Sequence, residues 1–188
     1  MPNIQEQSYL YHLTALENLP SILLRGLLPR SQLFGFSDVA DHEILASRAT
    51  YHLNEMVPFH FFARNPFDGR VQSIYPSRQF VLIAVSRKIA EESGWLISPK
   101  HPLSGGFKII SYHEGMEQID WELMNTRDYH NAECKSVCMA ECLSPTVVPP
   151  KSFSAIYVKD DETKLFVLKL VKEAELTCYV NVQPSMFL

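Results

Sequence analysis

The sequence contains none of the motifs that define the common nucleotide, metal and hydrolase sites, and it has no long apolar run. No Walker P-loop, GxGxxG, HExxH, EF-hand loop or GxSxG occurs, so a conventional nucleotide-binding fold has no support. The longest apolar stretches, Phe80–Val85 and Leu165–Leu170, are far too short to cross a bilayer. The N-terminus has no basic segment followed by an apolar core. We therefore expect a cytoplasmic protein with no signal peptide and no membrane partner.

The chain also lacks the composition of disordered or fibrous proteins. Of its 188 residues, 46% are hydrophobic and 20% are charged, which is close to the average for globular proteins. This length suits one domain and is short for two, so we expect residues 1–188 to form a single domain. The net charge of −4 argues against a permanent coat on nucleic acid, although it permits a brief enzymatic encounter.

Cysteine is scarce, and its spacing is not that of a zinc site. The four cysteines are Cys134, Cys138, Cys142 and Cys178, and the first three recur every four residues. Structural zinc sites use CxxC-type pairs or nearby histidines, and nothing in the sequence calls for a disulfide framework. We expect these side chains to be small, partly buried hydrophobes, and we expect no metal.

One central segment reverses the charge of the chain. Residues 48–100 carry seven basic and four acidic groups, a net charge of +3, and they include many aromatic side chains and histidines. Cations interleaved with aromatic rings suit single-stranded nucleic acid, whose phosphates attract charge and whose bases stack. A solvated loop beside a core strand explains the same pattern. The composition leaves both interpretations open.

The hydrophobic pattern predicts many short strands and few helices, an α+β protein with antiparallel sheets. Thr14 and Glu17 have the spacing of a capping box for the first helix, and Gly26 follows as its C-cap. Asn65-Pro66 and Asp68-Gly69 indicate a loop, and residues 114–135 are expected to mix a short helix with a long loop. The predicted helices are Leu16–Arg25, Asp41–Leu53 and Lys88–Glu92, and the predicted strands are Ser8–Leu13, Val57–Phe62, Gln79–Val85, Phe107–Tyr112, Val137–Leu143, Ser154–Val158, Lys164–Leu170 and Cys178–Val182.

Glu141 is the least expected residue in the chain. It stands between Met139-Ala140 and Cys142-Leu143, so its carboxylate either faces solvent from one side of a strand or lies in a pocket with a partner. Acids placed in this way are frequent catalytic candidates. His12, between Tyr11 and Leu13, is either a core histidine or part of a site, and Arg48 indicates nothing by itself.

Three segments carry motifs in a defined order. They are YHLTALENLPSILLRGLL, from Tyr11 to Leu28, then VPFHFFARNP, which begins at Val57, and finally MAECLSPTVVPP followed by IYV. In this order they resemble the DarT family of NAD-dependent ADP-ribosyltransferases, toxins that modify bases in single-stranded DNA. The first segment is similar to the family's NAD-binding opening, the second to its VPF-aromatic-F segment, and the third to the strand that carries the catalytic glutamate. The likeness runs from Tyr11 to about Val158, with His60 where a tyrosine is expected.

This resemblance implies two short antiparallel sheets that face each other, with NAD in the cleft between them and a few helices at the periphery. It implies a mono-ADP-ribosyltransferase that uses NAD as co-substrate, without a metal, to modify thymine or guanine in single-stranded DNA. It also implies a cognate DarG-like antitoxin that removes ADP-ribose. Glu141 and Arg48 would be catalytic, the NAD site would include His12, Thr14, Asn18, Gly26, Leu28 and Arg48, and the DNA-contacting residues of the basic segment would be His60, Arg64, Arg70 and Arg78.

Other functions compete with this one. A related transferase could act on RNA or protein with the same pocket, and an assay of all three acceptors with labelled NAD distinguishes them. A catalytically silent nucleic-acid-binding module would have no reason to keep both Glu141 and Arg48. RNA 2′-phosphotransferases also open on a histidine strand, but they favour paired His and Arg residues over a late glutamate.

Overall fold

The structure is a computed structural model that describes residues 3–33, 52–101 and 107–188. Arg48 and most of the predicted helix Asp41–Leu53 lie outside the described residues. The strands are β1 (Tyr9–Ala15), β2 (Val57–His60), β3 (Phe80–Ser86), β4 (Leu96–Ser98), β5 (Ile110–Ser111), β6 (Glu141–Ser144), β7 (Phe153–Val158) and β8 (Tyr179–Val182). The α-helices are α1 (Leu19–Arg25), α3 (Pro66–Ile74), α4 (Arg87–Glu92), α5 (Tyr112–Gln118), α6 (Trp121–Thr126), α7 (Ala132–Val137) and α8 (Asp161–Glu173).

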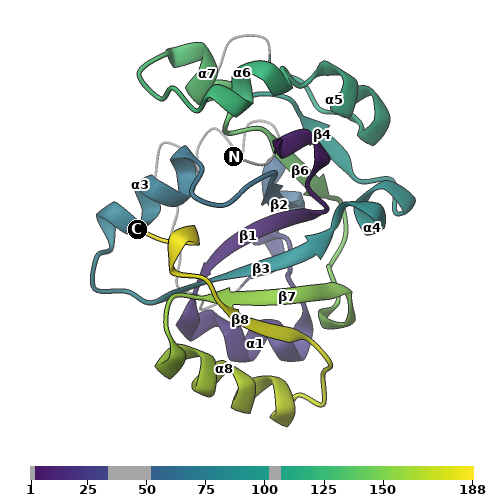
Figure 1. The fold of residues 1–188 in the computed structure, drawn as a ribbon. Coiled ribbons are helices and arrows are strands. Elements are labelled where there is room, and N and C mark those ends of the chain that lie inside the picture. Colours follow the sequence, from purple (N-terminus) through teal and green to yellow (C-terminus); the bar gives the residue numbers. More distant parts are fainter. Residues whose placement is uncertain (1–2, 34–51, 102–106) are drawn as a thin grey trace.

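Within the described residues, eight strands form one mixed sheet in the order β5-β4-β6-β2-β1-β3-β7-β8 (Figure 1). The pairs are antiparallel, except that β7 and β8 run parallel and are connected by α8. The α+β class is therefore confirmed, whereas the expectation of two separate antiparallel sheets is wrong. The half-sheets β5-β4-β6-β2 and β1-β3-β7-β8 form one sheet because Tyr11 of β1 pairs with His60 of β2.

The two faces of the sheet carry separate hydrophobic cores. On one face, Leu10, Phe59 and Ile83 belong to the larger core, which α1, α6, α7 and α8 help to build. On the other face, Tyr11 and Leu82 pack with side chains of α3 and the C-terminal segment. In Figure 1, α6 and α7 stand above the β2–β6 side, α1 and α8 lie below, and the C-terminus lies beside α3. Strand β3 is buried at six consecutive positions because its side chains enter the two cores alternately, one on each face of the sheet.

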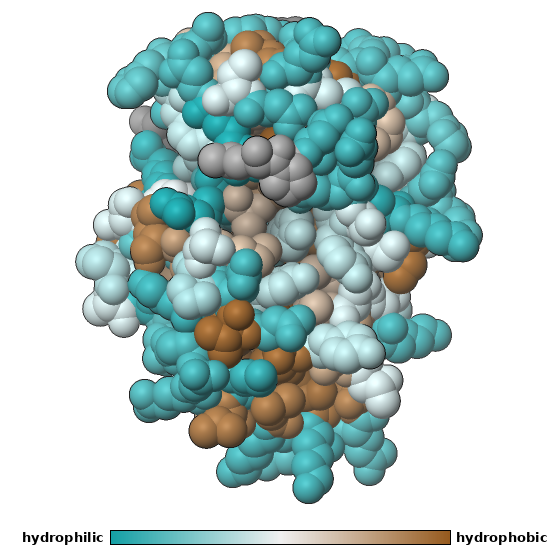
Figure 2. Space-filling model, viewed as in Figure 1, coloured by the Kyte–Doolittle hydropathy of each residue, from teal (hydrophilic) through white to brown (hydrophobic). Residues whose placement is uncertain are grey.

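Helix α8 replaces the predicted strand Lys164–Leu170. The side chain of Asp160 caps the helix by accepting a hydrogen bond from the Thr163 backbone N–H at 2.8 Å. Thr163, Val167 and Val171 are buried at intervals of four residues, while Leu165, Phe166 and Leu168 between them are exposed. This spacing is helical. The prediction of a strand at Lys164–Leu170 is wrong because a short apolar run fits a strand and a helix equally well. Figure 2 shows the resulting apolar patch at the lower end of the molecule, over α8.

Turn signals were also misinterpreted at the other helices. Asn65 and Pro66 begin α3 as N-cap and first helical residue, instead of marking a loop. Thr14 lies inside β1 and does not cap the first helix, since the Leu16–Asn18 segment forms a 3₁₀ turn before α1. The segment 114–135 is mostly helical, in α5, α6 and α7, and β6 begins only at Glu141. Gly26 is the C-cap of α1 as predicted, with φ of +87°.

Candidate active site

Glu141 is the first residue of β6, and its side chain is buried rather than solvated, with 6% of its surface exposed. In the sheet it lies opposite His60 on one side and Ser98 on the other, and His60 lies opposite Tyr11. Residues directly opposite each other project from the same face of a sheet. Four strands therefore place a row of polar side chains around the carboxylate. Of the two sequence-based alternatives for Glu141, this burial contradicts the one in which the carboxylate faces solvent.

The imidazole of His60 is held at this row by contacts on two sides. Its Nδ1 lies 3.2 Å from the carbonyl oxygen of Ala140, and its ring lies 5.4 Å from the ring of Phe67. His60 is only 5% exposed. Tyr11, the next member of the row, is also buried, and burial together with the neighbouring Tyr157 raises its pKa to about 12. Its hydroxyl is therefore protonated at neutral pH and available as a hydrogen-bond donor.

The structure brings three of the predicted NAD-binding residues together. The Asn18 side-chain amide donates to the Thr14 hydroxyl at 3.3 Å, and Thr14 is 5% exposed. His12 and Thr14 are two residues apart on β1, so their side chains share a face. The cluster formed by His12, Thr14 and Asn18 offers an imidazole, a hydroxyl and an amide to a ligand, as binding of a ribose or a carboxamide requires.

This cluster and the Glu141 row lie on opposite faces of β1, at the boundary between the two halves of the sheet. Tyr11 and His12 are consecutive residues of an extended strand, so they leave it on opposite faces. Beyond the Tyr11–His60 pair, β1 and β2 no longer pair, and the Nδ1 of His12 lies 2.8 Å from the carbonyl oxygen of Pro58 instead. The imidazole of His12 therefore bridges the two strands where they separate.

The remaining predicted NAD residues lie after α1. A Cβ added to Gly26 would stand 2.6 Å from the carbonyl oxygen of Val148, so the backbone there admits no side chain. The following residue, Leu27, exchanges two backbone hydrogen bonds with Val148, and Leu28 is half-buried. This contact anchors the start of the Leu28 loop to the segment that follows β6.

The predicted DNA-contacting arginines surround α3 but differ in their surroundings. Arg64 and Arg70 are exposed. Arg78 stacks on the ring of Tyr75 at 4.6 Å and lies 3.9 Å from the carboxylate of Glu17. His60, predicted with them, is buried and lies opposite Glu141 in the sheet, so it belongs to the Glu141 row and not to the exposed surface around α3.

Asp68 is a buried carboxyl group, although the Asp68-Gly69 pattern predicts a loop. Its Oδ2 accepts hydrogen bonds from the side-chain amide of Asn65 at 2.9 Å and from the backbone N–H of Arg64 at 3.1 Å. Within the described part of the chain, its Oδ1 is buried and has no hydrogen-bond partner. Burial raises the pKa of Asp68 to about 7, although these hydrogen bonds act in the opposite direction. The Asn-Pro-x-Asp pattern, which is typical of a helix start, is the signal that could have revealed it.

The expectation that the cysteines are core residues is confirmed for Cys134, Cys138 and Cys142, which are buried and free, and Cys178 is half-buried and free. Burial raises the pKa of the Cys138 thiol to about 12. Among residues 3–33, 52–101 and 107–188, no group of three or more His, Cys, Asp or Glu side chains is arranged to hold a metal ion. No helix in these ranges is both long and apolar enough to span a membrane.

The fold is similar to that of solved DarT and DarTG structures. Thermus sp. 2.9 DarT in complex with ADP-ribosylated ssDNA matches with a TM-score of 0.86 and 20% identity over 97% of both chains. The same protein in complex with NAD⁺ matches with a TM-score of 0.79 and 19% identity, over 97% of this chain and 98% of that one. Thermosipho africanus DarTG in complex with ADP-ribose matches with a TM-score of 0.75 and 26% identity, over 96% of this chain and 51% of that one. The chain therefore has the mixed α+β fold of these DarT structures.

Sequence comparison defines the family within that class. A curated DNA ADP-ribosyl transferase–DNA ADP-ribosyl glycohydrolase fusion protein of Thermosipho africanus (strain H17ap60334) is 28% identical over 192 residues, 95% of this chain. The chain spans about half the length of that relative, 49%. The model of the family described as "ssDNA thymidine ADP-ribosyltransferase, DarT" matches residues 11–188. The chain belongs to the DarT family, as its sequence motifs indicate.

Proposed function

We propose that this chain transfers ADP-ribose from NAD to a thymine base of single-stranded DNA. The family membership over residues 11–188 supports this activity, and the description of that family names thymidine. The single structural observation that carries the proposal is the buried carboxyl of Glu141, which lies in register with His60 of β2. A guanine acceptor is the alternative that the oligonucleotide experiment below distinguishes.

In this reaction the bond between the ribose C1′ and the nicotinamide nitrogen breaks, and nicotinamide leaves as a neutral molecule with the bonding electron pair. A ring nitrogen of the base forms the new bond to C1′ and releases its proton to the solution. Positive charge develops on the ribose before the base attacks, and the Glu141 carboxylate would stabilise this charge while accepting a hydrogen bond from a ribose hydroxyl. Its burial strengthens both interactions because little water screens them.

We propose that NAD lies where β1 and β2 separate, with His12, Thr14 and Asn18 as its hydrogen-bonding residues. The joining of the two half-sheets through one pair supports this placement, as does the bridging position of His12. Gly26 and Leu28 would shape the wall of the pocket, where the backbone approaches closely. Arg48 is proposed to bind NAD and to assist proton removal, on family likeness alone. The reaction needs no metal in this proposal, because the leaving group departs uncharged.

We further propose that residues 1–188 act as one transferase domain and that Arg64, Arg70 and Arg78 contribute to binding of the DNA strand. The fusion relative pairs a transferase with a glycohydrolase, which supports a DarG-like partner that removes ADP-ribose. A toxin–antitoxin pair with this chemistry acts on cytoplasmic DNA, and the free cysteines of the chain agree with that compartment.

The proposal is tested with NAD and single-stranded oligonucleotides that differ in one central base, analysed by intact mass. We expect one added ADP-ribose on oligonucleotides that contain thymine, and much slower labelling when the complement is annealed, because a paired base must first be unstacked. Labelling of RNA or protein in place of DNA supports the related transferase instead. If NAD remains unconsumed with DNA, RNA and protein acceptors, at enzyme concentrations where relatives are active, an enzymatic function is contradicted.

A further inference from the structure

Helix α8 carries an apolar surface that is left open in the described part of the chain. Leu165, Phe166 and Leu168 are 70%, 47% and 40% exposed. Leu24 of helix α1, which contacts α8, is also exposed. Single exposed leucines are ordinary, but several on one helix form a contiguous apolar patch, which indicates a contact with another molecule. Figure 2 shows this patch at the lower end of the molecule.

The two exposed leucines of α8 lie between charges of opposite sign. Successive members of this α8 row are four, three and four residues apart, which places them along one side of the helix, and all of them are exposed: Asp161, Leu165, Leu168 and Lys172. Asp161 lies in the first turn and Lys172 in the last, where each charge also stabilises the helix dipole. The dipole accounts for the two charges, but it gives no reason for exposed leucines between them.

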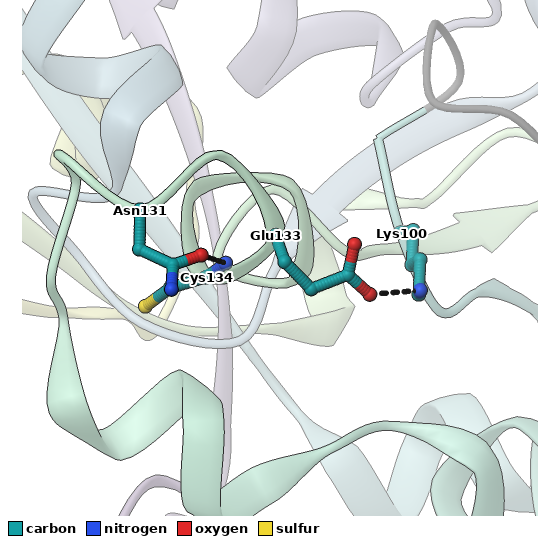
Figure 3. Close-up of polar contacts among 4 residues, drawn as sticks. All are labelled: Lys100, Asn131, Glu133 and Cys134. Carbon is teal, nitrogen blue, oxygen red and sulfur yellow. Dashed lines mark hydrogen bonds and ion pairs between the residues drawn. The ribbon is translucent and has the colours of Figure 1, made fainter.

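The end charges of the α8 row are not used inside the described chain. Helix α7 shows the contrast, since its exposed Glu133 forms an ion pair with Lys100, which follows β4 (Figure 3). Within residues 3–33, 52–101 and 107–188, neither Asp161 nor Lys172 forms an ion pair. Both charges of α8 are therefore available to a molecule that covers the leucines.

The α8 row is complementary to itself in one orientation. If a second copy of α8 lies antiparallel to the first, with a two-fold axis between residues 166 and 167, Leu165 of each copy faces Leu168 of the other. Asp161 of each copy then faces Lys172 of the other. Parallel helices would instead bring like charges together at both ends. Interfaces with two-fold symmetry use the same patch on both copies, so this order of residues favours a second copy of the chain as the occupant.

We propose that two copies of this chain associate through α8, as an antiparallel helix pair about a two-fold axis. The leucines form the apolar centre of the interface, and the charge pairs at its ends fix the orientation. Stable interfaces bury about 800 Å² per partner, and one helix face is smaller, so monomer and dimer exchange reversibly. The proposal does not rest on the transferase activity. Helix α8 packs against β8 at one edge of the sheet, and β6 lies in the other half, so association leaves the Glu141 row open (Figure 1).

Sedimentation velocity over a range of protein concentrations measures the association. We expect the wild type to show a monomer–dimer equilibrium with a Kd in the micromolar range. Leu165→Ser should raise this Kd about 100-fold, because each dimer loses two buried leucines that contribute roughly tenfold each. Ile74→Ser is the matched control, since Ile74 is an exposed apolar residue on α3, and its Kd should equal that of the wild type.

A charge exchange tests the antiparallel orientation. Asp161→Lys and Lys172→Asp each place like charges opposite each other at both ends of the dimer, so each variant alone should raise the Kd about tenfold. An equimolar mixture of the two variants restores both opposite-charge pairs, and it should associate with nearly the wild-type Kd. Thermal melting confirms that each variant is folded, because the new charges oppose the helix dipole.

Three results overturn the proposal. The first is a wild type that stays monomeric at every concentration. The second is a mixture of the two charge variants that associates no better than either variant alone. The third is a monomeric wild type whose binding to a purified DarG-like glycohydrolase is weakened by Leu165→Ser, which assigns the α8 face to that partner. The rate of ADP-ribose transfer per chain is measured separately, and the proposed function stands or falls on that rate whichever result is found.

Discussion

Glu141 and His60 lie directly opposite each other in the β2–β6 ladder, and both side chains are almost completely buried. The imidazole is fixed from behind by the Ala140 carbonyl oxygen and from the side by Phe67. This pairing explains how a carboxylate in an apolar strand becomes part of a polar row, since the neighbouring strand supplies a polar group at the same level. It also gives His60 a position next to the proposed reaction centre.

We expect His60→Phe to lower kcat about tenfold while changing KM for DNA much less. Phenylalanine keeps the ring packed on Phe67 but cannot hydrogen-bond to the Ala140 carbonyl, so the start of β6 loses one tether beside Glu141. Steady-state rates at varied DNA concentration measure this separation. A large rise in KM with unchanged kcat would return His60 to the role of a DNA contact.

We expect Asn18→Ala to raise KM for NAD roughly fivefold, the value of about one hydrogen bond, with little change in KM for DNA. The Asn18 amide belongs to the cluster with Thr14 and His12, which we propose as the NAD site. Asn181→Ala, at an exposed position of β8, serves as the control. Equal KM values for NAD in the two variants would remove Asn18 from the NAD site.

Gly26→Ala should destabilise the protein by about 2–3 kcal/mol, because φ is +87° and the new Cβ would overlap the Val148 carbonyl oxygen. Gly69→Ala is the matched substitution, since Gly69 lies within α3 and an added Cβ meets no atom within 4 Å. We expect that variant to gain up to about 1 kcal/mol from helix propensity. Urea unfolding of both proteins measures the difference, and equal effects would contradict the assigned backbone constraint.

Asp68 makes the stability depend on pH. Its pKa is raised to about 7 in the folded protein, whereas an unfolded aspartate titrates near 3.8. The protonated form is therefore favoured by folding: this contribution is complete below about pH 4 and is lost as the pH rises to about 7, by up to about 1.4 kcal/mol per pH unit. Asp68→Asn removes this titration, so its stability relative to the wild type should rise between pH 4 and 7. A difference in unfolding free energy that stays constant over this range would show that Asp68 titrates normally.

Local patterns predicted much of the fold where one signal dominates. The sequence correctly predicts the strands around Leu13 and Ile83 and the helix cap at Gly26. Buried strands consist of apolar residues, and a positive φ favours glycine. Asn65-Pro66 was read as a turn, although the same residues begin a helix when a buried Asp68 completes the cap. The union of the two half-sheets depends on one cross-strand pair, Tyr11 with His60, and no local pattern encodes such a long-range contact.

The family motifs indicate the candidate site residues, whereas composition does not. The spacing of the residues around Glu141 is compatible with a solvated face and with a pocket, and only the folded structure shows that the side chain is buried.

The catalytic role of Glu141 is tested most directly by the single-turnover rate of ADP-ribose transfer to a thymine-containing single strand. This rate is measured for the wild type and for Glu141→Gln. Glu162→Gln, on the exposed face of α8, is the control. Glutamine keeps the size of the side chain and removes its negative charge, so stabilisation of the positive ribose is lost. The account predicts a rate 100–1,000-fold lower, about 3–4 kcal/mol, for Glu141→Gln at unchanged thermal stability, and a wild-type rate for the control. Transfer by Glu141→Gln at the wild-type rate would contradict it.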